Sequence, residues 1–304
     1  MRRELRAVIA PAYDGMEVKA YARTVMKISS TLLNKMKYSE GILVNNKQVF
    51  ATKRLSAGDQ LLFLLPEGNL SENVLPEKGE LDIYYEDQDL LILNKKSGVA
   101  VHPNKGHESG TVANYLAEYY QQNGMAASCH LVNRLDTGTS GLMVIAKHAY
   151  AQERLVAQME AGIFVRNYFA MVHGCFAKKE GKIEASIARP DAATIKRIID
   201  PCGKYAATNY MVLKSTKSTS LLRLWLDTGR THQIRVHMSY LGHPLYGDFL
   251  YGHEEKAISH TALHSCYLSL VHPITGKRMH WCSAPPTDFQ ALIFDCFCEL
   301  KSDR

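Results

Sequence analysis

The sequence predicts an α+β protein with two parts. A small α+β domain is expected over residues 1–66, a linker over 67–80, and a larger domain over 81–304 that is built on a mainly antiparallel, mixed β-sheet flanked by helices and loops. Three observations lead to this prediction: the positive charge is concentrated near the N-terminus, a segment of linker composition follows, and the β-like runs beyond it do not alternate regularly with helices. A chain of 304 residues is also longer than one hydrophobic core usually serves.

The charge distribution sets the first part apart from the second. Residues 1–70 contain eleven Lys and Arg against six Asp and Glu, which accounts for five of the six net positive charges of the chain. A small basic module beside a nearly neutral one favours the capture of a polyanion. The alternative is that five excess charges on a surface have no partner at all.

The elements of the first part follow from local patterns. Apolar residues at helical spacing predict a short amphipathic helix over 17–28, and Ser29 or Ser30 is expected to cap a second helix. Residues 42–50 read as a β-hairpin, because Asn tolerates the positive φ of a tight turn. A last strand is expected over 60–65.

The second part begins after a segment rich in Pro, Gly and Glu. Short β-like runs then recur, at 83–85, 90–93, 141–146, 168–172, 183–187, 210–213, 221–226, 264–270 and 279–282. Helices are expected near 111–121, 148–161, 231–241 and 287–299. Irregular alternation of this kind is typical of an antiparallel α+β sheet.

Several function classes find no support in the sequence. No apolar run is long enough to cross a membrane, and the basic N-terminus lacks the apolar segment of a signal peptide, so we expect a cytoplasmic protein with no membrane partner. The seven cysteines are scattered without a Cys-x-x-Cys, which favours reduced thiols. No dinucleotide or P-loop motif is intact, and His232 and His237 are wrongly spaced for chelation, so no cofactor and no metal are expected.

Two segments carry candidate chemistry. In residues 130–147, Asp136 lies in a turn rich in Thr, Ser and Gly just before a buried strand, a place where rigid elements often hold a catalytic carboxylate. The alternative is an Asp that only bonds the backbone of its turn. In residues 226–237, Thr231 is expected to cap a helix whose first turn groups several donors, which suits an anion; the alternative is a solvated helix start. These donors are Arg230, His232, Gln233 and Arg235.

Together these segments resemble the signature of the RluA-type pseudouridine synthases. The matching motifs occur in the family's order: Arg134-Leu-Asp136-Thr-Gly-Thr-Ser-Gly141, Arg166-Asn-Tyr168-Phe-Ala-Met-Val-His-Gly174 and Thr228-Gly-Arg-Thr-His-Gln-Ile-Arg235. The N-terminal part resembles the alpha-L RNA-binding domain that many members carry. The chain departs from the usual pattern at Lys96 (usually proline), Asn133 (often histidine) and Arg166 (usually lysine).

The resemblance implies an enzyme that isomerises uridine to pseudouridine in RNA without a cofactor. By family position Asp136 is the nucleophile, Arg235 the cation that keeps it ionised, and Tyr168 the residue that stacks on the base or removes a proton. The implied substrate-binding residues are Ile234 in the pocket wall, Arg134 at the vacated base position and Arg230 on the backbone. Attack on the sugar, attack on the ring and a glycal route all need the same carboxylate and stay open.

The expected partner is RNA, and the expected form is a monomer. Large-subunit ribosomal RNA is favoured over transfer RNA, because an appended RNA-binding domain is usual in members that modify ribosomal RNA. Two other interpretations remain. A non-catalytic RNA-binding or ribosome-assembly factor would have lost Asp136 or Tyr168, and both are present. A hydrolase of a small substrate would not need the basic first domain.

Overall fold

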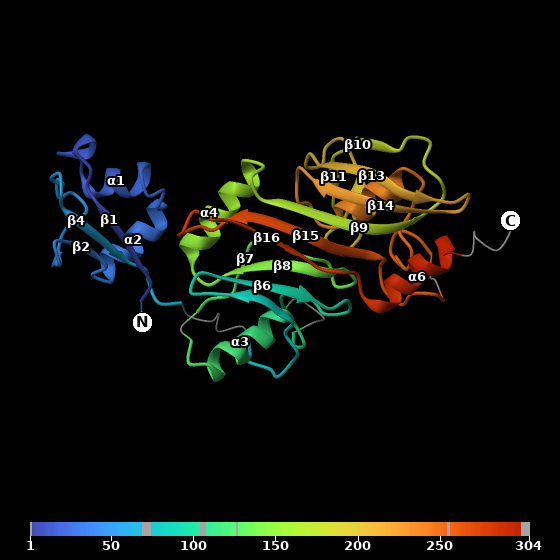
Figure 1. Ribbon diagram of the computed structural model, residues 1–304, viewed down its shortest axis with the longest axis horizontal. Helices are drawn as coiled ribbons and strands as arrows, with labels where there is room; N and C mark the ends of the chain where they lie inside the picture. Colours follow the sequence, from blue (N-terminus) through green and yellow to red (C-terminus); the bar gives the residue numbers. More distant parts are fainter. Residues whose placement is uncertain (1, 69–73, 104–107, 126, 254–255, 299–304) are drawn as a thin grey trace.

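The chain forms two β-sheets of very different size (Figure 1). The structure, a computed structural model, describes residues 2–68, 74–103, 108–125, 127–253 and 256–298. The middle of the expected linker, 69–73, and the end of the last expected helix lie outside these residues. The mixed, mainly antiparallel α+β class predicted from the sequence is confirmed.

The small sheet is made by the first 64 residues and has the strand order β1-β4-β2-β3. Its elements are β1 (Glu4–Val8), a 3-10 turn (Pro11–Tyr13), α1 (Val18–Thr24), α2 (Ser30–Tyr38), β2 (Ile42–Val44), β3 (Lys47–Gln48) and β4 (Gln60–Leu64). Strand β1 was not foreseen, because it is a five-residue run with two charged residues and no clean alternation. It pairs antiparallel with the whole of β4.

The capping and turn residues of this part mostly have the structures that the sequence predicts. Ser29 is the N-cap of α2, and its hydroxyl accepts a hydrogen bond from the Leu32 amide at 3.1 Å. Asn45 and Asn46 have φ of 51° and 62° in the hairpin turn. The helix expected over 17–28 was too long: α1 ends at Thr24, and Lys27 has φ of 56°, which no helix accommodates.

The large sheet has ten strands in the order β10-β13-β14-β9-β15-β8-β6-β5, with β16 beside β15 and β7 beside β8. One pair, β15 with β8, is parallel; the other pairs of this sheet are antiparallel. The strands are β5 (Ile83–Glu86), β6 (Leu90–Lys95), β7 (His130–Leu131), β8 (Ser140–Ala146), β9 (Val165–His173), β10 (Glu180–Glu184), β13 (Ala207–Ser215), β14 (Thr219–Leu226), β15 (Leu263–Val271) and β16 (Arg278–Cys282). A separate short hairpin is formed by β11 (Ile187–Ala188) and β12 (Ile198–Ile199).

Helices cover both faces of the large sheet. The helices are α3 (Val112–Gln122), α4 (Ala149–Glu160), α5 (Gln233–Tyr240) and α6 (Thr287–Cys298). Alternate residues of β6 and β8 point to opposite sides, so Leu91 and Met143 share a cluster with α3 and α5 while Leu90 and Leu142 share one with α4. Burial on both faces explains why these strands read as continuous apolar runs.

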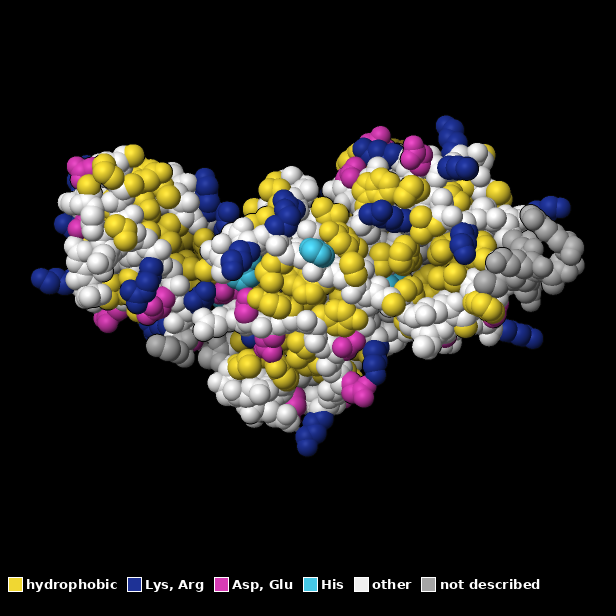
Figure 2. Space-filling model, in the orientation of Figure 1, with side chains coloured by type: hydrophobic (Ala, Val, Ile, Leu, Met, Phe, Trp, Pro, Cys, Tyr) yellow, Lys and Arg dark blue, Asp and Glu magenta, His cyan; other side chains and the backbone are white. Residues whose placement is uncertain are grey.

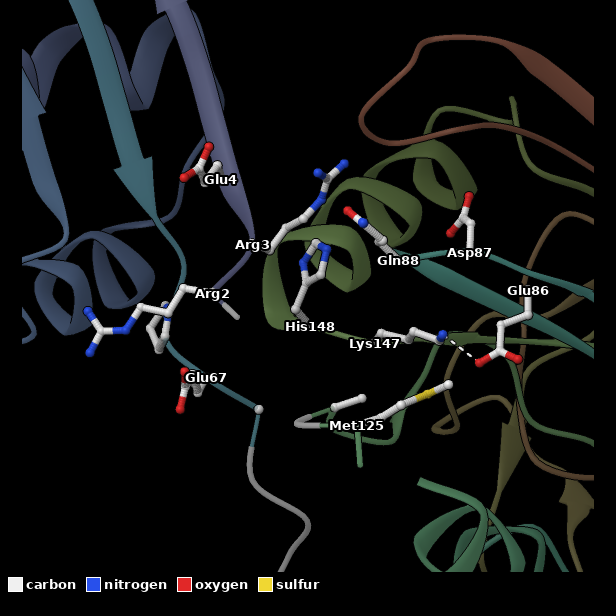
Figure 3. A pocket seen from close by; sticks show the side chains of 13 residues that line it. Arg2, Arg3, Glu4, Glu67, Glu86, Asp87, Gln88, Met125, Lys147 and His148 are labelled. Carbon is white, nitrogen blue, oxygen red and sulfur yellow. Dashed lines mark hydrogen bonds and ion pairs between the residues drawn. The ribbon is translucent and has the colours of Figure 1, made fainter. Parts of the chain in front are cut away.

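Polar and apolar contacts join the small sheet unit to the large one. Arg3, directly before β1, donates two hydrogen bonds to Asp89, at 2.7 and 2.9 Å, and His148 Nε2 pairs with the same carboxylate at 2.9 Å. Tyr150 on α4 packs into the core of the small unit and donates to the Met26 carbonyl. Figure 3 shows the cleft of about 640 Å³ beside this junction, with Arg3 on one side and His148 on the other.

The described thiols of Cys129, Cys175, Cys202, Cys266 and Cys282 form no disulfide, in agreement with the expectation of reduced cysteines; the side chain of Cys298 lies outside the described set.

We expect the junction to weaken in acid. Burial alone would raise the pKa of Asp89, but the bonds from His148 and Arg3 lower it to about 2. A carboxyl with a depressed pKa in the folded state stabilises the protein above about pH 4, and this contribution is lost as the pH falls towards 2. Arg3→Leu should therefore cost up to about 2 kcal/mol at pH 7 and progressively less below pH 4, measured as the thermal unfolding midpoint against pH.

The matched control is Arg6→Leu, three residues further along the chain in β1. Arg6 pairs with Glu4 on an exposed surface, where an ion pair contributes little, so its loss should be nearly silent. A cost of Arg3→Leu that stays constant from pH 7 to pH 2 would show that Asp89 is not its source.

Candidate active site

Asp136 lies in a tight turn directly before β8. The turn is closed by a hydrogen bond from the Thr139 amide to the Asp136 carbonyl at 3.0 Å, and the Asp136 side chain keeps 25% of its surface exposed. Gly141 sits where β8 meets β15: it has φ of 109°, and a Cβ there would lie 2.4 Å from the Ser265 carbonyl oxygen. The small residues after Asp136 thus let its turn pack closely against the neighbouring strand.

A buried lysine fixes the same turn from the other side. Lys95, at the end of β6, donates from Nζ to the carbonyls of Lys96, Val99 and Thr137 at 2.8–3.1 Å. Burial lowers the pKa of Lys95 to about 7, and the charge of Asp136 opposes this shift. Because the Thr137 carbonyl is one residue from the nucleophile candidate, this ammonium restrains the backbone that carries Asp136.

Arg235 on α5 stands between two carboxylates. Its Nε and Nη2 donate to the two oxygens of Asp248 at 2.8 and 2.7 Å, and its Nη1 reaches Asp136 at 3.4 Å. Burial would lower the pKa of Arg235, but the bonds to Asp248 and the charges of both carboxylates raise it. Arg235 is therefore a fixed cation, and the structure places it beside Asp136, where the resemblance implied a cation.

Apolar side chains adjoin the carboxylate. Tyr168 on β9, Ile234 on α5 and Leu135 belong to one buried cluster. Burial raises the pKa of Tyr168, the nearby Arg166 lowers it and Asp136 raises it further. A phenol in this setting stays protonated near neutral pH.

The start of α5 differs from the expectation. Thr231 does not cap the helix: His232 is the N-cap, in the left-handed region with φ of 58°, and makes no capping bond. The Gln233 side chain is used internally, accepting from Thr228 and the Arg230 amide and donating to β13. Of the four donors expected to converge on an anion, Gln233 is used to fix the loop and Arg235 pairs with two carboxylates, which leaves Arg230 and His232.

The two remaining expected substrate-binding residues lie at the surface. Arg134 is exposed, next to the buried Leu135. Arg230 is also exposed, and its Nε donates to the Tyr205 carbonyl at 3.0 Å. Neither makes an ion pair with Asp136 among the residues that the structure describes.

Comparison with known proteins adds independent information. The family model for RNA pseudouridylate synthase matches residues 89–240. The chain is 43% identical over 279 residues to the uncharacterized RNA pseudouridine synthase YjbO of Bacillus subtilis, covering 91% of this chain and 98% of that one. It is 33% identical over 307 residues to ribosomal large subunit pseudouridine synthase D of Escherichia coli, covering 96% and 94%. The chain belongs to the RluA-type RNA pseudouridine synthase family.

A solved structure agrees with this assignment. Human RNA pseudouridylate synthase domain containing 1 superposes with a TM-score of 0.56 at 26% identity, covering 69% of this chain and 86% of that one. The protein is therefore an RNA pseudouridine synthase, an isomerase, as the sequence motifs predicted.

Sequence reasoning gave no role to two residues that hold the site. The partners of Asp248 and Lys95, which are Arg235 and Thr137, are 13 and 42 residues away along the chain. Charged residues are rarely fully buried, so the burial of these two marks them as important. A sequence does not show which charged residues are buried.

Two further features bear on the expectations of no metal and no membrane partner. Asp87, Asp89 and His272 lie close enough to hold a metal ion, but Asp89 is bonded to Arg3 and His148 and Asp87 to Tyr85, so we interpret the group as an ion-pair network. Over the described ranges, no helix combines the length and the apolar character needed to span a bilayer.

We expect Asp248→Asn to destabilise the protein strongly. The carboxyl is fully buried, and the amide would place an NH₂ group against a guanidinium donor and leave Arg235 with only Asp136 as a counter-ion. Removing one partner of a buried pair costs about 3–5 kcal/mol, so the unfolding midpoint should fall by roughly 5–10 °C. The matched control is Asp227→Asn, since Asp227 is exposed; equal midpoints for both variants would contradict the role of Asp248.

Proposed function

We propose that this enzyme converts uridine to pseudouridine in large-subunit ribosomal RNA, with Asp136 as the nucleophile. The observation that carries the catalytic part is the contact at 3.4 Å between a partly exposed Asp136 and the buried Arg235 guanidinium. A carboxylate enclosed by RNA and protein tends to take up a proton unless a cation is near. Arg235 supplies that cation without leaving Asp248.

In this proposal the reaction breaks the bond from C1′ to N1 of uracil and forms one from C1′ to C5; C5 loses its hydrogen as a proton, and N1 takes up a proton. The base must turn between the two steps, so a flat apolar surface suits it better than several fixed hydrogen bonds. Tyr168 and Ile234 would supply that surface. Since burial raises the pKa of Tyr168, we assign its ring to stacking and not to proton removal.

Arg134 and Arg230 would contact the RNA outside the pocket. A uridine must leave its stack before it can reach Asp136, which costs a few kcal/mol. An exposed guanidinium next to Leu135, as in Arg134, suits the space that the base vacates or the phosphate beside it. The Nε of Arg230 is already bonded to a carbonyl, so its terminal nitrogens would contact the RNA backbone.

The choice of ribosomal RNA rests on the relatives and on the small basic unit. The Escherichia coli and Yersinia pestis relatives that match over most of the chain are ribosomal large subunit pseudouridine synthases by name. Residues 1–66 would form an RNA-binding domain of the alpha-L type, joined to the catalytic domain, 81–304, through 67–80. We also propose that the enzyme acts as a monomer in the cytoplasm, which light scattering and cell fractionation test.

The reaction is tested by tritium release from transcripts labelled at C5 of uracil, with ribosomal and transfer RNA supplied side by side. The wild type should release tritium, and Asp136→Asn should be slower by a factor on the order of 10⁴ or more. Asp227→Asn is the control and should retain the wild-type rate. Release from transfer RNA alone would overturn the ribosomal assignment, and equal rates for Asp136→Asn and wild type would overturn the nucleophile.

A groove between α1 and α2 is the proposed RNA contact of the small unit. It has a volume of about 520 Å³ and is lined by Lys19, Arg23 and Lys37 together with small polar residues. On the face shown in Figure 2, Lys and Arg side chains are spread over both units among hydrophobic and uncharged atoms. Three cations along one groove suit the spacing of backbone phosphates.

We expect each alanine substitution at Lys19, Arg23 or Lys37 to weaken RNA binding. Each should lower the slope of log affinity against log salt by about one while the rate at saturating RNA stays unchanged, as filter binding over a salt series measures. Lys47→Ala, on β3 outside the groove, is the control. Salt slopes that match the wild type in all three variants would rule out the groove as the RNA contact.

A further inference from the structure

Tyr251 lies in the loop after α5 and is held rigidly beside the catalytic cluster. Its amide donates to Asp248 at 3.2 Å, and Ser239 on α5 donates to its carbonyl at 3.1 Å. The guanidinium of Arg235 stands 5.1 Å from the centre of its ring, within the range of a cation–π contact. Asp248 therefore supports both Tyr251, through its backbone amide, and the Arg235 guanidinium, which pairs with Asp136.

The hydroxyl of Tyr251 joins two segments. It accepts a hydrogen bond from the backbone amide of Arg197 at 2.7 Å, and it lies 2.8 Å from Nδ1 of His232. A backbone amide can only donate, so the phenol proton is left for Nδ1. If Nδ1 carried the proton instead, the phenol proton would have no acceptor among the described residues.

This network assigns the His232 tautomer with its proton on Nε2. Nε2 makes no hydrogen bond within the described part of the chain, and it is not among the side-chain atoms that are fully buried without a partner. Its N–H is therefore available to a ligand. Burial lowers the pKa of His232; the charges of Asp136 and Asp248 raise it, and those of Arg235 and Arg197 lower it. His232 thus offers a neutral donor in the electrostatic field of the proposed nucleophile.

We propose that Tyr251 is a positioning residue: its hydroxyl keeps His232 neutral and oriented, so that Nε2–H donates to an acceptor oxygen of the target nucleotide while Asp136 remains paired with Arg235 alone. A protonated His232 would be a second cation beside Asp136 and would make its carboxylate less reactive. The strained backbone of His232, with φ of 58°, indicates that the surrounding structure holds this ring in place at some cost.

The proposal rests on the proposed function for its substrate, but the state of His232 can be measured without any RNA. Nuclear magnetic resonance of ¹⁵N-labelled histidine rings reports both the tautomer and the titration midpoint, and His232→Asn assigns the signal. We expect the Nε2–H tautomer in the wild type. In Tyr251→Phe the midpoint should rise by about half to one pH unit, because a hydrogen bond that favours the neutral form is lost. A proton on Nδ1 in the wild type, or an unmoved midpoint, would overturn the proposal.

The catalytic consequence is tested by the pH profile of tritium release at saturating RNA. Tyr251→Phe should move the acidic limb upwards by the same half to one unit, and so slow the reaction up to about tenfold below that limb. In a His232→Asn background, which keeps the left-handed backbone and cannot titrate, the same change should leave the limb where it is. A shift that persists in that background would also overturn the proposal.

Tyr240→Phe is the matched control. Tyr240 is the last residue of α5, the helix whose N-cap is His232, and it is 61% exposed. Removing its hydroxyl should therefore change neither the histidine titration nor the pH profile. A wild type that releases no tritium from any RNA would contradict the proposed function, whereas the histidine titration would still decide the role of Tyr251.

Discussion

The site depends on one guanidinium shared between two carboxylates. Arg235 gives its two short bonds, at 2.8 and 2.7 Å, to the fully buried Asp248, and reaches the partly exposed Asp136 with a longer one at 3.4 Å. The short pair holds the cation in place, since a buried charge needs a partner with good geometry. The long contact places the same cation beside Asp136 without tying that carboxylate down, as the proposed role of a nucleophile requires.

The rest of the scaffold brings this trio together from distant parts of the chain. Lys95 restrains the turn that carries Asp136, and Gly141 lets that turn approach β15. Gln233 ties the loop before α5 to β13, which fixes where the helix begins and therefore where Arg235 points. Each of these residues acts through backbone atoms, so each limits the freedom of a loop that the sheet alone would leave loose.

Much of this arrangement could be read from the sequence, and the failures have physical causes. Strands buried on both faces and the Ser29 cap leave strong local signals, and the three motifs identified the family. Strand β1 was missed because its pairing with β4 is formed across more than 50 residues and not by its own pattern. The prediction that four donors converge at the start of α5 failed for a related reason. A side chain such as Gln233 can hydrogen-bond to the backbone of another strand, and residue spacing does not reveal that.

The junction between the two units bears on the proposed recognition of RNA. Arg3 and Asp89 form a two-pronged ion pair, and Tyr150 of α4 is buried in the core of the small unit, so the groove between α1 and α2 is held at a fixed position relative to Asp136. Two sites on one rigid body bind an RNA together only if its shape spans both, and the second contact then adds affinity at little entropic cost. Proteins recognise folded RNA by its shape and by splayed-out bases, so the junction would contribute to the choice of uridine if the groove binds RNA as we propose.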